Sequence, residues 1–108
     1  MKLRIDGKSL RLRLSDAEVT QFKQTGKVEE VISFGSFPEE KLRYILTEEA
    51  TIQNLEVTFE KNTVTVQVPS ATALIWVNSN QNGIEAMVQN GTEKKLKVLI
   101  EKDLDCLH

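Results

Sequence analysis

Basic residues are concentrated at the start of the chain, where their spacing could create an anion-binding surface. Five of the fourteen lysines and arginines lie within the first fourteen positions: Lys2, Arg4, Lys8, Arg11 and Arg13. Because alternate residues of a strand share a face, we expect Arg4, Arg11 and Arg13 to lie together. Such a group could bind phosphate, an acidic protein segment or nucleic acid. The alternative is internal pairing with Glu29, Glu48 or other carboxylates.

The only cysteine and the only histidine, Cys106 and His108, lie within the last three residues. A thiolate and an imidazole are both metal ligands, but a structural zinc site needs four ligands and one chain offers two here. A homodimer could complete the set, or Asp103 and Asp105 could add oxygen ligands. The alternative is a frayed terminus with a spare thiol. We therefore predict no cofactor and keep Cys106 and His108 as candidates for a metal-linked dimer.

Other catalytic arrangements find little support in the sequence. A lone histidine on the tail excludes an ordinary serine or threonine triad, and the isolated glycines form no phosphate-binding loop. Carboxylates occur as adjacent pairs, whose side chains point to opposite faces of a strand and do not converge. Glu30 differs because it has the strand parity of Val28 and Ile32. It is therefore a candidate inward-facing polar group at the mouth of a cavity.

Alternating leucines and turn residues predict the elements that position these side chains. Leu3 to Ile5 and Leu10 to Leu14 alternate with polar residues, which indicates two half-buried strands joined by an Asp6-Gly7 turn. Ser15 and Glu18 form a capping-box pattern that predicts a helix ending at Gly26. Two further strands are expected at 28–34 and 42–48. The second half predicts strands at 55–59, 63–68, 84–88 and 95–102, and a helix from Pro69-Ser70 more buried than the first.

The order of these elements reflects an internal repeat. A shift of fifty-four positions lays the apolar residues of the first hairpin over those of the third predicted pair, and it lays Phe22 over Trp76. Repeats at about 2–49 and 55–103 indicate two units that share one core. We therefore predict a single domain over 1–108 with an α+β fold, in which a strand-strand-helix-strand-strand unit occurs twice. Its eight mostly antiparallel strands would form a barrel-like sheet, or a two-layer sheet with both helices on one face.

Composition places the chain among ordinary globular proteins. It has 108 residues, is 40% hydrophobic and 28% charged, and carries a net charge of −2. That charge argues against a nucleic-acid binder, whose domains usually carry a basic excess. No apolar run reaches the roughly twenty residues that a membrane helix needs. A single cysteine fits a reducing compartment, so a cytoplasmic location is expected.

Two segments carry a resemblance to a known family. MKLRI followed by SLRLRLS at the start, and LIEKDLDCL at 99–107, resemble a small family of uncharacterised bacterial proteins with a domain of unknown function. The resemblance spans nearly the whole chain. It implies a small cytoplasmic bacterial protein and supplies no activity, cofactor, partner or site residue.

The sequence thus leaves the function unknown and two classes open. The first is a small non-enzymatic binding protein that uses the basic first hairpin to contact an acidic protein or another anionic partner. The second is a metal- or small-ligand-dependent protein, either an enzyme with a polar cluster near Glu30 or a dimer linked through Cys106 and His108. A closed polar pocket would favour the second class.

Overall fold

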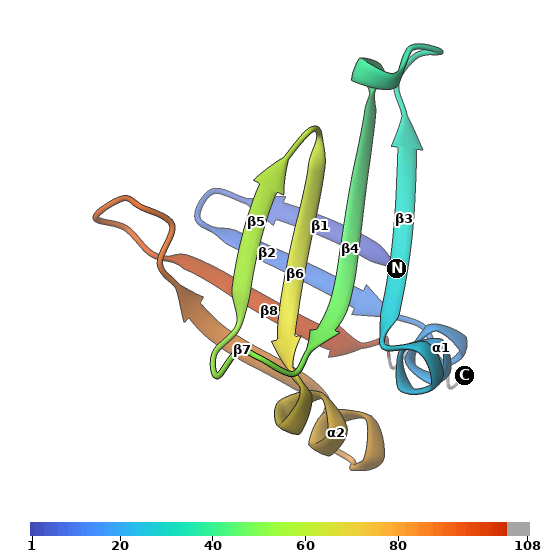
Figure 1. Cartoon of the computed structure of the whole chain (residues 1–108), viewed down its shortest axis with the longest axis vertical. Helices are drawn as coiled ribbons and strands as arrows, with labels where there is room; N and C mark the ends of the chain where they lie inside the picture. The colour runs from blue at the N-terminus through green and yellow to red at the C-terminus, as the bar shows by residue number, and fades with distance from the viewer. Residues whose placement is uncertain (104–108) are drawn as a thin grey trace.

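The computed structural model describes residues 1–103, which form eight β-strands, two α-helices and a short 3-10 helix (Figure 1). The strands are β1 (Lys2–Asp6), β2 (Ser9–Leu14), β3 (Lys27–Ser33), β4 (Lys41–Glu49), β5 (Glu56–Glu60), β6 (Thr63–Pro69), β7 (Gly83–Val88) and β8 (Leu96–Lys102); the helices are α1 (Asp16–Thr25), α2 (Ser70–Asn78) and η1 (Pro38–Glu40). This confirms the predicted α+β class, with its strands and helices in the expected order. Cys106 and His108 lie outside the described residues.

The strands form two four-stranded sheets and not a closed barrel. The first sheet has the order β1-β2-β8-β7, and the second has the order β3-β4-β6-β5. The outer pairs of each sheet are antiparallel hairpins, whereas the central pairs, β2 with β8 and β4 with β6, are parallel. The barrel-like prediction is therefore corrected. Helices α1 and α2 each connect a strand of one sheet to a strand of the other sheet. The outer strand of a hairpin therefore forms each sheet edge, and the two sheets do not join into a closed barrel.

The two central pairings have matching registers. In the first sheet Leu12 lies opposite Ile100, and in the second sheet Val66 lies opposite Leu46. Each residue of one pair is fifty-four positions from a residue of the other. Strands from both halves of the chain thus meet at the centre of each sheet, and Figure 1 shows the strands of one sheet crossing over those of the other.

The core lies between the sheets and extends under the helices. The inward residues of β2, β4, β6 and β8 are almost completely buried, including Leu12, Leu46, Val66 and Ile100. Figure 1 shows α1 and α2 together at one end of the molecule. There Phe22 and Trp76 pack edge to face, with ring centroids 6.1 Å apart and an interplanar angle of 67°. The two aromatic rings therefore pack the helices against each other.

Both helices match the predictions made from the sequence. Helix α1 begins with the predicted capping box, in which Ser15 Oγ accepts from the backbone of Glu18 and the Glu18 carboxylate accepts from the backbone of Ser15. Helix α2 is buried more fully than α1, as predicted, because it buries Ala73 and Trp76 whereas α1 buries only Phe22. Leu74 and Ile75 on its outer side are 62% and 60% exposed. Helix α2 contacts β4 and β6, the central strands of the second sheet, and buries a single stripe of its surface. No helix within residues 1–103 is long and apolar enough to cross a membrane.

Candidate functional site

The predicted basic face forms a shallow hollow on the outer surface of the first sheet. This first-sheet hollow has a volume of about 120 Å³ and is lined by Lys2, Arg4, Arg11 and Arg13. The hairpin places Arg4 opposite Arg11 and Lys2 opposite Arg13. Like charges directly opposite one another destabilise a sheet unless other groups compensate. The structure thus brings together all three arginines that the sequence singled out.

Compensating carboxylates come from β8 and the residue that follows it. Glu101 Oε1 lies 3.3 Å from Nε of Arg11 and 2.8 Å from Nη2 of Arg13. Asp103 Oδ2 accepts from the Lys2 ammonium at 2.9 Å. Arg11 and Arg13 are therefore paired within the fold, although their partner is Glu101 and neither Glu29 nor Glu48. The parallel β2–β8 pairing, which sets Arg13 beside Glu101, could not be read from the alternation of apolar residues.

Arg4 differs from its neighbours in the first-sheet hollow. It is exposed on the edge strand β1. Among residues 1–103, no carboxylate lies within ion-pair distance of its guanidinium group. Within residues 1–103, Arg4 is thus the cation of the first-sheet hollow whose guanidinium group is open to an external anion, beside the paired Arg11. A planar anion can accept hydrogen bonds from such guanidinium groups in pairs.

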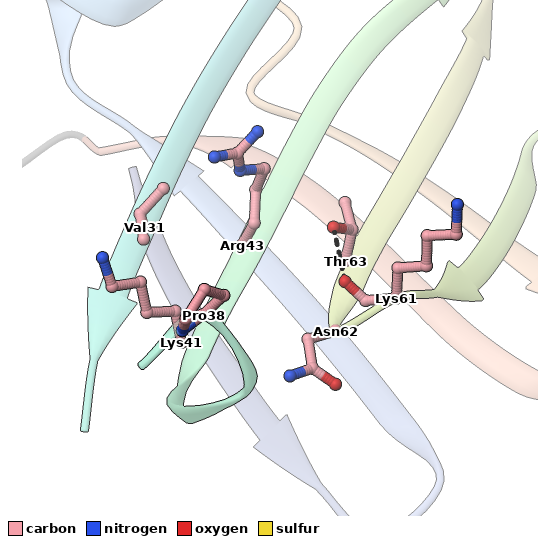
Figure 2. Close-up of a pocket in the computed structure, with 7 residues that line it drawn as sticks. All are labelled: Val31, Pro38, Lys41, Arg43, Lys61, Asn62 and Thr63. Atoms are coloured by element: carbon pink, nitrogen blue, oxygen red, sulfur yellow. Dashed lines mark hydrogen bonds between the residues drawn. The ribbon is translucent and has the colours of Figure 1, made fainter. Parts of the chain in front are cut away.

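A second basic hollow, which the sequence analysis did not predict, lies on the outer surface of the second sheet (Figure 2). This second-sheet hollow has a volume of about 330 Å³ and is lined by Val31, Pro38, Lys41, Arg43, Lys61, Asn62 and Thr63. Its residues come from β3, η1, β4, the β5–β6 turn and the start of β6. The parallel β4–β6 pairing brings Arg43 beside Thr63, and no local sequence signal indicates that juxtaposition.

Hydrogen bonds fix the two loops that border the second-sheet hollow. Lys61 and Asn62 have φ angles of 50° and 60°, as a tight hairpin turn with two left-handed residues requires. The Asn62 carbonyl accepts from the Arg43 amide at 3.0 Å, and the Asn62 side-chain amide donates to the Glu39 carbonyl at 3.0 Å. The β5–β6 turn is therefore tied both to β4 and to η1, so the rim is held in place from two sides.

The charge in the second-sheet hollow is largely uncompensated. Arg43 Nη1 lies 3.6 Å from Glu29 Oε1, a long ion pair. For Lys41 and Lys61, no carboxylate among residues 1–103 lies within ion-pair distance. In Figure 2 the two lysines stand on opposite sides of the hollow, and the Arg43 side chain lies between them. Among the described residues, three cations therefore line this hollow, and only Arg43 has a carboxylate within ion-pair distance.

The candidate Glu30 takes part in a different cluster. Its Oε1 accepts from the Met1 ammonium group at 3.1 Å, and a Glu18 carboxylate oxygen accepts from the same group. The Tyr44 hydroxyl donates to the Met1 carbonyl at 2.8 Å. Glu30 thus balances a cation and lines neither hollow. Within residues 1–103, no group of three or more histidine, cysteine, aspartate or glutamate side chains could hold a metal ion.

The Met1 cluster shifts the pKa values of its members. Burial alone lowers the pKa of the Met1 ammonium, but the hydrogen bonds to Glu18 and Glu30 outweigh it and the net pKa rises above 8.0. Burial raises the pKa of Glu18, whereas its bonds to the ammonium and to Ser15 outweigh this and lower the pKa overall. Burial also raises the pKa of Tyr44, helped by the nearby Glu30 and Glu18 charges. These groups link the N-terminal residue to α1, β3 and β4 and therefore have a structural role.

Comparison with known proteins places the chain in a family. The chain matches a family of unknown function (DUF7009) over residues 1–108. The protein belongs to this family. No curated protein and no solved structure matches the chain significantly. Membership of DUF7009 confirms the predicted resemblance to a domain of unknown function.

Proposed function

We propose that this DUF7009 protein is a non-enzymatic binding protein whose first-sheet hollow receives an acidic segment of another protein. The observation that carries the proposal is the hollow itself. Among residues 1–103 it is lined by Lys2, Arg4, Arg11 and Arg13, and no carboxylate from this part of the chain lies within ion-pair distance of Arg4. A surface with excess positive charge attracts an anionic partner and orients it during encounter. The neighbouring Glu101 limits the affinity because it competes for Arg11 and Arg13.

The spacing of the cations supports an extended peptide as the partner. Arg11 and Arg13 are two residues apart on β2, and Lys2 and Arg4 are two residues apart on β1. Alternate residues of a strand are separated by about 6.6–6.8 Å. Acidic side chains at alternate positions of an extended peptide have the same separation. Such a peptide can therefore place successive carboxylates over successive cations of the hollow.

A binding assay with a defined acidic peptide tests this function. A fluorescein-labelled peptide of alternating glutamate and serine is titrated with the protein, and anisotropy is recorded at low and at moderate salt. We expect saturable binding that weakens with salt, because exposed charges are screened beyond about 10 Å at 0.1 M ionic strength. Arg4→Gln should weaken binding several-fold. Lys23→Gln, which removes one exposed charge from α1, is the matched control and should change the affinity much less.

The outcomes separate the proposal from nonspecific attraction. Equal losses for Arg4→Gln and Lys23→Gln would show that only net charge matters, and the first-sheet hollow would then not be the binding site. The absence of saturation with the acidic peptide would contradict the proposal directly. Capture from a cell lysate with wild-type protein and with the Arg4 variant can then identify the partner.

We further propose that the protein is one domain built from an internal duplication, with repeats at about 2–49 and 55–103. The matched registers of Leu12 with Ile100 and of Val66 with Leu46 support this proposal. The hairpins support it as well, since Leu3 pairs with Leu12 and Val57 pairs with Val66. The single cysteine supports a cytoplasmic location. If the halves arose by duplication, the basic residues of the first hairpin are specific to the first repeat. The apolar core positions are common to both repeats.

A further inference from the structure

We infer that the second-sheet hollow is a separate binding site for a small organic phosphate monoester. The phosphate group would lie among Lys41, Arg43 and Lys61, and the organic part would cover Val31 and Pro38. This site lies on a different sheet from the first-sheet hollow and uses none of its residues. It goes beyond the proposed binding of an acidic protein segment, and the two proposals can be tested independently.

Charge favours a phosphate monoester over a carboxylate. A phosphate monoester carries about −1.5 to −2 charges near neutral pH and offers three acceptor oxygens. The hollow presents three cations, and within residues 1–103 the carboxylate at ion-pair distance from them is that of Glu29, 3.6 Å from Arg43. Arginine supplies a planar fork for two phosphate oxygens, and lysine supplies a compact point charge. A monoanionic carboxylate would leave more of this positive charge without a counterion.

Size and lining favour an organic ligand over the bare inorganic ion. The volume of about 330 Å³ falls at the lower end of the roughly 300–1,000 Å³ typical of small-molecule sites. Val31 is 44% exposed and forms an apolar part of the lining beside Pro38. An apolar group placed over these two side chains would remove their surface from water. The arrangement thus offers one polar region and one apolar region to the same molecule.

The corresponding position in the first sheet provides an internal comparison. There, a hollow of only about 80 Å³ is lined by Ser9, Leu10, Arg11, Lys97 and Leu99. Lys97 lies fifty-four positions after Arg43, and its ammonium is paired with Glu85 at 2.9 Å. Gly7 stands where Lys61 stands in the second hairpin. The larger volume, and the cation that stands in place of Gly7, are therefore specific to the second-sheet hollow and are not a general consequence of the fold.

Nuclear magnetic resonance titration of the full chain tests the site. Phenyl phosphate is added to ¹⁵N-labelled protein, with inorganic phosphate and benzoate titrated in parallel. We expect saturable shifts at the amides of residues 41–43 and 61–63, with phenyl phosphate binding more tightly than either comparison compound. Benzoate binding as tightly as phenyl phosphate would overturn the phosphate assignment. Inorganic phosphate binding as tightly would overturn the contribution of Val31 and Pro38, and shifts confined to other residues would overturn the site.

Charge variants give the second test. The double variant Lys41→Gln, Lys61→Gln should weaken phenyl phosphate binding by about tenfold or more, because each change removes a charge-assisted contact. Lys97→Gln, at the equivalent place in the first sheet, is the matched control and should bind like the wild type. Arg4→Gln should also leave this binding unchanged, which separates the site from the first-sheet hollow. An unchanged affinity in the double variant, or an equal loss in Lys97→Gln, would overturn the inference.

Discussion

At the scale of single residues, arginines on one hairpin have different roles. Arg11 and Arg13 share the Glu101 carboxylate, whose side chain is only 14% exposed. Arg4 has no such contact within residues 1–103 and projects from the edge strand. Because exposed charges contribute little to folding, Arg4 is available for recognition at little cost in stability. The two paired arginines contribute to the same surface while neutralising a half-buried charge.

This division predicts different stabilities for two variants. Arg4→Gln should change the free energy of unfolding by less than about 0.5 kcal/mol, as is usual for an exposed substitution. Replacing both Arg11 and Arg13 by Gln should cost about 1–3 kcal/mol, since the Glu101 carboxylate then loses its charged partners. Urea denaturation measures both values. A loss for the double variant no larger than that for Arg4→Gln would mean that Glu101 is fully solvated.

The Met1 cluster predicts a pH dependence of stability at both ends of the scale. The pKa of Glu18 is lowered from 4.5, so its contribution is present above about that pH and is lost as the pH falls through the folded-state pKa. The pKa of the Met1 ammonium is raised from 8.0, so its contribution is complete below about pH 8 and is lost as the pH rises through the folded-state pKa.

Glu18→Gln tests this pH dependence without removing the helix cap. Glutamine can still accept a hydrogen bond at the third position of a capping box, so the change isolates the charge. We expect a lower melting temperature at neutral pH and a shallower loss of stability on both the acid and the alkaline side. Thermal unfolding from pH 3 to pH 10 measures it. A pH profile parallel to that of the wild type would assign the dependence to other groups.

At the scale of elements, the sequence predicted local structure well and strand partners poorly. The capping box of Ser15 and Glu18 and the hairpin turn after Asp6 depend on neighbouring residues, which the sequence displays directly, although the turn residues are Gly7 and Lys8, one position later than predicted. The parallel β2–β8 and β4–β6 pairings depend on residues far apart, and alternation reveals only which face is apolar. The first-sheet hollow arises within one hairpin and was predicted. The second-sheet hollow requires the β4–β6 pairing and was not.

The contact between the helices predicts the most damaging substitution. Trp76 is fully buried against Phe22, and its indole N–H donates to the Asn82 carbonyl at 3.0 Å. Trp76→Ala should cost about 3–5 kcal/mol, the usual range for truncating a large buried aromatic. Leu74→Ala, on the exposed side of the same helix, is the control and should cost much less. Chemical denaturation decides, and a loss below about 1 kcal/mol for Trp76→Ala would be inconsistent with this packing.

At the scale of the whole molecule, each sheet contains one hairpin from each half of the chain. The first sheet joins β1–β2 to β7–β8, and the second joins β3–β4 to β5–β6. The connections through α1 and α2 cross from one sheet to the other. Neither half can therefore complete a sheet by itself, and the buried faces of Leu12 and Val66 both need strands from the other half.

This arrangement predicts that the halves fold only together. Fragments 1–53 and 54–108 divide the chain in an exposed connection between β4 and β5. Each fragment alone should lack a cooperative unfolding transition, because a unit of about fifty residues with half of each sheet missing buries too little apolar surface. An equimolar mixture should recover the β-sheet circular dichroism spectrum and the fluorescence of a buried Trp76. Analytical ultracentrifugation would show whether either fragment forms a homodimer instead. A fragment that folds as a monomer would contradict the proposal that the two halves share one core.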